Sequence, residues 1–116
     1  HGGRILKRLG DGLMATFPSS ADALSAALVM QHVATRRGGL QLRIGVHTGV
    51  ARWREGDLVG HDVNLASRIA DRATGGQILV SEPVRAAAKG VPARFRRARP
   101  LAVPGREPTV LFRVER

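Results

Sequence analysis

The sequence predicts an α+β fold in which helices pack on a mostly antiparallel sheet. Short apolar runs with strand-like patterning recur along the 116 residues, and longer segments with helical periodicity separate them. Asp-Gly and Gly-Gly pairs lie between several of these segments, which is typical of hairpins and helix ends. The length is that of one small domain, and the chain contains no internal repeat or linker.

A β-hairpin is expected first, because the apolar-rich runs 4–9 and 13–17 flank the sequence Gly-Asp-Gly. Asp11, at the tip, has two interpretations. A hairpin turn alone explains an Asp-Gly pair, whereas a carboxylate between two glycines could also bind Mg²⁺ beside a phosphate chain. Lys7 lies on the first strand, where it is either a functional cation or an edge-strand lysine that opposes aggregation.

A long helix should follow the hairpin. Ser19 with Asp22 three residues later resembles a capping box, and Gly38-Gly39 would end the helix. The expected apolar face comprises Ala23, Leu24, Ala27, Leu28, Met30 and Ala34.

The middle of the chain predicts two strands and a second helix. Residues 40–47 alternate between apolar and polar and indicate a half-buried strand, and residues 50–53 continue as a strand that turns at 55–57. Residues 61–73 have helical periodicity, and Gly75-Gly76 follow them. The side chains expected to face inward are Val63, Ala66, Ile69, Ala70 and Ala73.

The C-terminal part predicts a buried strand over residues 77–80 and a short helix over 82–89 capped by Ser81. Two more strands are expected near 94–98 and 109–114. We expect the helices to cover one face of the sheet.

Composition excludes several classes of protein. The absence of cysteine excludes a disulfide scaffold, a thiol nucleophile and a thiolate zinc site, and no apolar run is long enough for a membrane span. The net charge of +10 suggests a nucleic-acid partner. However, most of this charge lies in residues 85–116, and three Phe and one Trp leave little for base stacking. We therefore expect no specific nucleic-acid partner.

Asn64 and Arg68 are four residues apart, so they project from the same face of the expected helix. They either bind a ligand, with the guanidinium on phosphate and the amide on a hydroxyl, or lie on a solvated face where Arg68 pairs with a residue such as Asp71. The histidines lack metal-ligand spacing and are interpreted as structural or exposed; they are His1, His32, His47 and His61.

Four segments resemble, in order, the class III adenylate/guanylate cyclase catalytic domain: HGGRILKRLGDGLMATF, LRIGVHTG, GDLVGHDVNLASRIA and GGQILVSEPV. The resemblance covers nearly the whole chain, and its specificity comes from the order and spacing of the four motifs.

The resemblance implies a ferredoxin-like sandwich that forms a head-to-tail dimer, expected to be a homodimer. Composite active sites would lie in the cleft between the two domains, and the protein is expected in the cytoplasm.

The resemblance implies conversion of ATP to 3′,5′-cyclic AMP and pyrophosphate by two-metal phosphoryl transfer. Asp11 matches one of the two aspartates that bind Mg²⁺ or Mn²⁺. Asn64 matches the asparagine that orients the ribose, and Arg68 the arginine that stabilises the transition state. Lys7 and Asp57 match the pair that reads the purine. Adenine presents an acceptor at N1 and a donor at N6, which suit a lysine and an aspartate, so this pair favours ATP over GTP.

The chain also departs from the family pattern. Nothing in it matches the motif Asp-Ile-x-Gly-Phe-Thr that carries the first metal-binding aspartate, so we expect a single partial domain, residues 1–116, that lacks its first strand and helices and belongs to a larger protein. Ala102 stands where the family often has a phosphate-binding lysine, and Arg106 could compensate. An alternative therefore stays open: a non-catalytic cyclase-like module for nucleotide sensing or dimerisation.

Overall fold

The computed structural model describes residues 2–9 and 12–115. The elements in chain order are β1 (Arg4–Leu9), β2 (Gly12–Thr16), α1 (Ser20–Gly38), β3 (Ile44–Val46), β4 (Arg52–Arg54), β5 (Asp57–Val59), α2 (His61–Arg72), β6 (Ile78–Ser81), α3 (Glu82–Ala87), β7 (Arg94–Leu101) and β8 (Thr109–Glu115). Each predicted helix and strand is present, although several begin or end at other residues.

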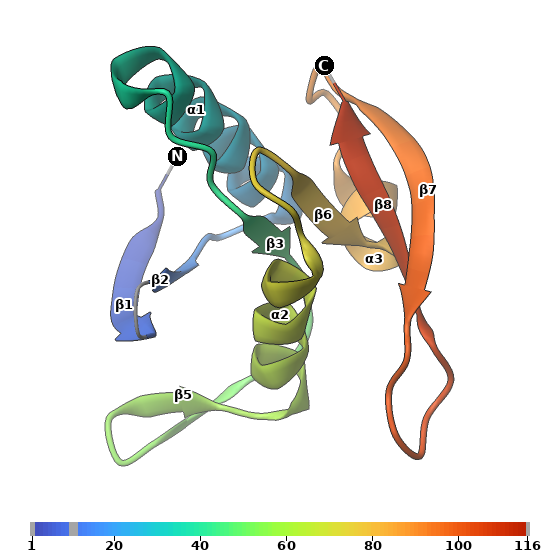
Figure 1. Cartoon of the computed structure of the whole chain (residues 1–116). Helices are drawn as coiled ribbons and strands as arrows, with labels where there is room; N and C mark the ends of the chain where they lie inside the picture. Colours follow the sequence, from blue (N-terminus) through green and yellow to red (C-terminus); the bar gives the residue numbers. More distant parts are fainter. Residues whose placement is uncertain (1, 10–11, 116) are drawn as a thin grey trace.

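The central sheet has the strand order β3-β6-β8-β7 (Figure 1). Its β3–β6 pair is parallel, and its β6–β8 and β7–β8 pairs are antiparallel. Two separate antiparallel hairpins, β1–β2 and β4–β5, complete the described strands. The predicted α+β class with mostly antiparallel pairing is confirmed.

The helices cover both faces of the central sheet, so the expectation of a single covered face was wrong. Ile78 and Val80 of β6 pack in one core cluster with residues of α1 and α3, whereas Leu79 packs in a second cluster with residues of α2. Because successive strand side chains point to opposite faces, α2 lies on the opposite face from α1 and α3. The buried side chains of α2 are Leu65 and Ile69, of which the sequence identified only Ile69.

The expected strand over residues 40–47 is much shorter in the structure, where β3 contains only Ile44–Val46. The side chain of Gln31 explains the difference. Its Nε2 donates to the Leu42 carbonyl and its Oε1 accepts from the Leu42 N–H, both at 2.8 Å. The Leu42 N–H is thereby bonded to a side chain rather than to a neighbouring strand, although the Leu42 carbonyl also accepts from the Gly76 N–H at 2.9 Å. Leu40 is not part of a strand, because its N–H donates to the Ala34 carbonyl of α1 at 3.1 Å, and the residue is 63% exposed.

The predicted caps of α1 are confirmed. The Ser19 hydroxyl accepts a hydrogen bond from the Asp22 N–H at 3.1 Å, and Gly39 ends the helix in the left-handed conformation with φ of 66°. Leu24, Ala27 and Leu28 are buried as expected, but Met30 is 45% exposed.

Gly45 determines how closely α2 can approach β3. A Cβ atom at Gly45 would lie 2.4 Å from the Ala70 backbone nitrogen, which no relaxed structure tolerates. We expect Gly45→Ala to lower the free energy of unfolding by about 1–3 kcal/mol, because the packed backbone must move. Chemical denaturation measures this change. Gly38→Ala is the matched control, since its Cβ meets only an ordinary contact at 3.7 Å; an equal loss in both variants would contradict the prediction.

Candidate functional site

Helix α2 presents the two polar residues that the sequence singled out. Asn64 and Arg68 are both exposed and lie four residues apart on this helix, so they share one face. The Arg68 Nη2 donates to the Ala102 carbonyl at 2.8 Å. The structure thus brings Arg68 beside the segment that follows β7, and no carboxylate partner for Arg68 is among the described ion pairs.

Arg72, one turn further along α2, also binds the end of β7. Its two terminal nitrogens donate to the carbonyls of Arg99 and Pro100, at 2.8 and 3.1 Å. Two arginines of α2 therefore hold the same stretch of backbone, and this similarity makes Arg72 a useful comparison for Arg68.

The other predicted site residues lie on the two hairpins. Asp57 is the first residue of β5, where its Oδ1 accepts from the Leu58 N–H at 2.8 Å. Lys7 lies on β1, and its backbone is opposite Met14 of β2. Asp11 lies outside the described residues. The structure therefore brings together Asn64 and Arg68 on one helix face, and the side chain of Lys7 lies outside the described part of the chain.

A cleft of about 330 Å³ separates the β1–β2 hairpin from the central sheet. Its walls include residues 13–17 on one side and residues 44–46 on the other, and Ala23, Ala27 and Met30 of α1 also line it. Strand β2 is paired only with β1, and β3 only with β6, among the described strands. The cleft therefore lies between two strands that each have one unpaired edge.

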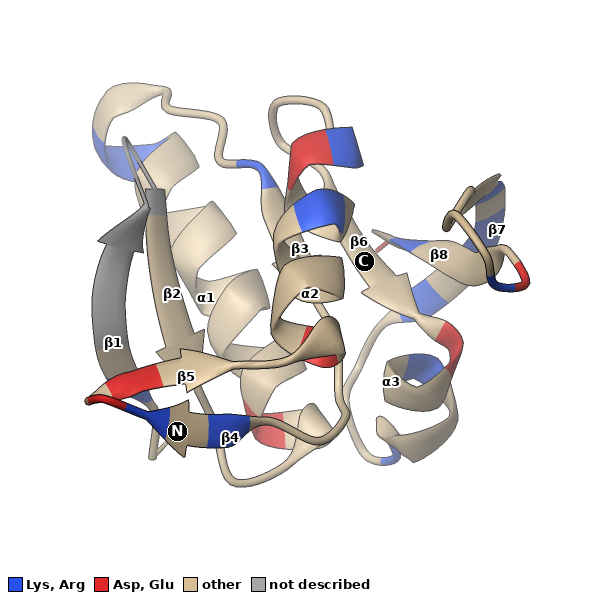
Figure 2. Ribbon diagram, turned by 90° about the horizontal axis from the view of Figure 1, so that it is seen from below, with Lys and Arg blue, Asp and Glu red and all other residues tan. Residues whose placement is uncertain are grey.

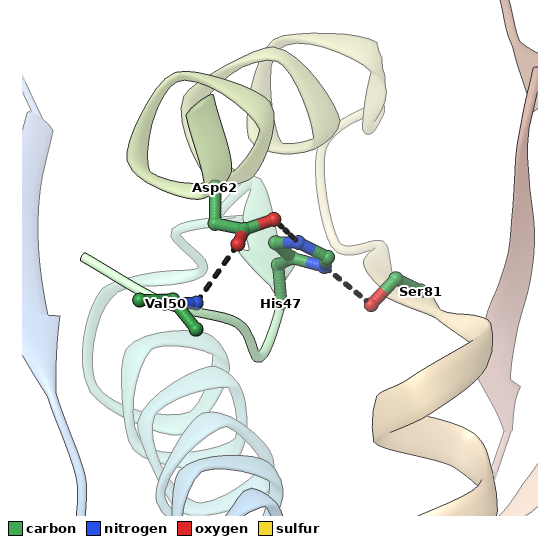
Figure 3. Close-up of polar contacts among 4 residues, drawn as sticks. All are labelled: His47, Val50, Asp62 and Ser81. Atoms are coloured by element: carbon green, nitrogen blue, oxygen red, sulfur yellow. Dashed lines mark hydrogen bonds and ion pairs between the residues drawn. The ribbon is translucent and has the colours of Figure 1, made fainter. Parts of the chain in front are cut away.

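His47, which the sequence placed among structural or exposed histidines, forms a partly buried polar network (Figure 3). Its Nε2 lies 2.8 Å from Asp62 Oδ1, and its Nδ1 lies 2.7 Å from Ser81 Oγ. Asp62 Oδ2 accepts from the Val50 N–H at 2.8 Å. Asp62 and Ser81 are 15 and 34 positions from His47 in the sequence, so no local sequence pattern could identify this network.

The network affects the acidity of Asp62. Burial raises the pKa of this carboxyl, but the hydrogen bonds from His47 and from the Val50 N–H, together with electrostatic interactions with His47 and His61, outweigh it. The pKa of Asp62 therefore lies below its usual value, and the carboxylate is ionised at neutral pH.

Two features are absent from the described part of the chain, a cluster of metal ligands and a membrane-spanning helix. No group of three or more His, Cys, Asp or Glu side chains could hold a metal ion there, and no helix is long and apolar enough to cross a bilayer. Figure 2 shows basic residues on several elements, including α2, β4 and β7, rather than on one element alone.

The fold and the polar face of α2 define an α+β domain with an exposed Asn–Arg pair on a helix, and comparison identifies its family. Residues 9–116 match the family model of the adenylate and guanylate cyclase catalytic domain. The chain belongs to this family.

Individual relatives agree with this assignment. An uncharacterized Mycobacterium tuberculosis protein is 40% identical over 83 residues, which are 70% of this chain and 28% of that protein. A pH-sensitive adenylate cyclase of the same species is 37% identical over 89 residues, 76% of this chain and 22% of that protein. This chain thus spans less than a third of either relative.

A solved structure supports the fold. The adenylate/guanylate cyclase/hydrolase from Silicibacter pomeroyi superimposes with a TM-score of 0.89 at 29% identity, over 99% of this chain and 73% of that one. The predicted resemblance to the class III cyclase domain is confirmed.

Proposed function

We propose that this chain is part of an adenylate cyclase catalytic domain that converts ATP to 3′,5′-cyclic AMP and pyrophosphate. The observation that carries the proposal is the exposed pair Asn64 and Arg68 on α2, within a chain that belongs to the cyclase family. Relatives that are named adenylate cyclases support ATP as the substrate.

In the proposed reaction, the ribose 3′-oxygen forms a bond to the α-phosphorus and loses its proton. The bond from the α-phosphorus to the oxygen bridging to the β-phosphate breaks, and pyrophosphate leaves. Asn64 orients the ribose through its amide. Arg68 neutralises charge that develops on the phosphate oxygens, which its planar guanidinium suits.

Asp11 is the residue that we propose for binding Mg²⁺ or Mn²⁺. A carboxylate oxygen is the ligand type that these hard cations prefer, but one carboxylate is an incomplete set. When bound, the ions lower the pKa of the attacking hydroxyl and neutralise the leaving phosphates.

A second copy of the chain and a further strand would complete this site in our proposal. The cleft between β2 and β3 exposes two unpaired strand edges, which an additional strand could pair with. Such a strand would bring the first metal-binding aspartate, which would complete the set begun by Asp11. Two protomers in a head-to-tail homodimer in the cytoplasm would then supply the metal site and the base-reading residues from opposite chains.

The proposal is tested by measuring cyclic AMP formation from ATP with Mn²⁺, using the domain in its natural full length. Activity that depends on the metal supports the proposal. A second candidate, a non-catalytic nucleotide-binding module, is favoured by the bond that Arg68 makes to the Ala102 carbonyl. Nucleotide binding without turnover would support that candidate and contradict the proposed cyclase activity.

Lys7→Glu tests the choice of base. We expect the preference for ATP over GTP to fall by about tenfold or more, because the carboxylate cannot donate to adenine N1. The ratio of kcat/KM for the two nucleotides measures it, with Lys89→Glu as the control for the same charge change. An unchanged ratio would remove Lys7 from the base-reading pair.

A further inference from the structure

We propose that His47 and Asp62 form a positioning pair that holds the first turn of α2, and thereby orients Asn64 and Arg68. This inference rests on the proposed function for its catalytic consequence. The pair joins the end of β3 to the start of α2, and Ser81 extends the connection to the end of β6 (Figure 3).

Helix α2 lacks an ordinary N-terminal cap. Its N-cap residue is Gly60, which makes no side-chain capping hydrogen bond. Asp62 lies in the first turn, where a negative charge interacts favourably with the helix dipole. Instead of bonding to its own helix, its carboxylate binds His47 and the Val50 N–H. The start of α2 is thus tied to the segment after β3.

The surroundings leave this carboxylate little freedom. A Cβ atom at Gly49 would lie 2.2 Å from the Asp62 Cγ, so the backbone after β3 passes directly against it. The His47 side chain is 7% exposed and that of Asp62 30%, and Ser81 is fully buried. Burial therefore shields the His47–Ser81 end of the network from water more than the Asp62 end.

The hydrogen bonds define the orientation of the imidazole. Asp62 can only accept, so Nε2 carries a proton, and in the neutral ring Nδ1 accepts from the Ser81 hydroxyl. Because a hydroxyl can also accept, the same arrangement holds a protonated ring.

The position of α2 matters because Asn64 follows Asp62 by two residues and Arg68 lies on the next turns. A small rotation of the first turn would displace both side chains from a bound nucleotide, and misplacement of about 1 Å can cost about 100-fold in rate.

The test compares Asp62→Ala, His47→Ala and the double variant in the natural full-length domain. We expect each single variant to lower kcat by about 10- to 100-fold with a smaller change in KM. The double variant should lose little more than the worse single one, because the two residues act through each other. Asp62→Asn, which can still hydrogen bond, should recover part of the activity.

Gln31→Ala is the matched control, because Gln31 also makes two 2.8 Å hydrogen bonds and contacts no residue of α2 through them. The thermal stability of the Gln31→Ala variant should fall while its kcat stays unchanged. Equal losses of kcat in Gln31→Ala and Asp62→Ala would overturn the positioning role.

Hydrogen exchange separates this inference from the proposed function. The amides of residues 64–66 should exchange faster in Asp62→Ala but not in Gln31→Ala, even if the wild-type domain proves inactive. Unchanged exchange in Asp62→Ala would overturn the positioning role of His47 and Asp62. Faster exchange in Asp62→Ala, combined with an inactive wild-type domain, would overturn only the proposed enzymatic activity.

Discussion

Arg68→Ala should lower kcat by about 100- to 1000-fold in the natural full-length domain, the scale observed when one charge-stabilising donor is removed. The reason is that the exposed guanidinium on α2 is proposed to stabilise charge in the transition state. Cyclic AMP formation with Mn²⁺ at saturating ATP measures the change.

Arg72→Ala provides the control for this experiment. Arg72 lies one turn away on the same helix and donates to the Arg99 and Pro100 carbonyls, whereas Arg68 donates to the Ala102 carbonyl. Both substitutions therefore remove an arginine that holds the end of β7. If both variants lose the same activity, Arg68 has a structural role and the assignment fails.

Asp11→Ala should reduce activity by at least about 1000-fold, because removing a metal ligand removes charge neutralisation in the transition state. We also expect weaker Mn²⁺ binding, which calorimetry can measure in the presence of ATP and independently of turnover.

Asp71→Ala is the matched control, since it removes an exposed carboxylate from α2 without changing the proposed metal site. Mn²⁺ affinity that is identical in the wild type and in Asp11→Ala would show that Asp11 only forms the turn.

The sequence predicted the elements well where local chemistry determines them. Ser19 and Gly39 cap the two ends of α1 as expected, since a cap depends on residues within one turn. The strand over 40–47 was predicted too long because Gln31, from another element, satisfies the Leu42 backbone. The alternation of apolar and polar residues within 40–47 cannot reveal a hydrogen-bond partner that comes from another element.

The site was predictable to a similar extent. Asn64 and Arg68 share a helix face, which spacing alone indicates. The importance of His47 was missed, because its partners Asp62 and Ser81 come from other elements.

By itself, the sequence determined the α+β class, the order of the elements and the family motifs, because periodicity, caps and turns act over a few residues. Only the tertiary structure decided that α2 covers the opposite sheet face from α1, that Gly45 permits its close approach, and that His47 ties its first turn to β3. These features depend on contacts between residues far apart in the chain, and such contacts exist only once the sheet has formed.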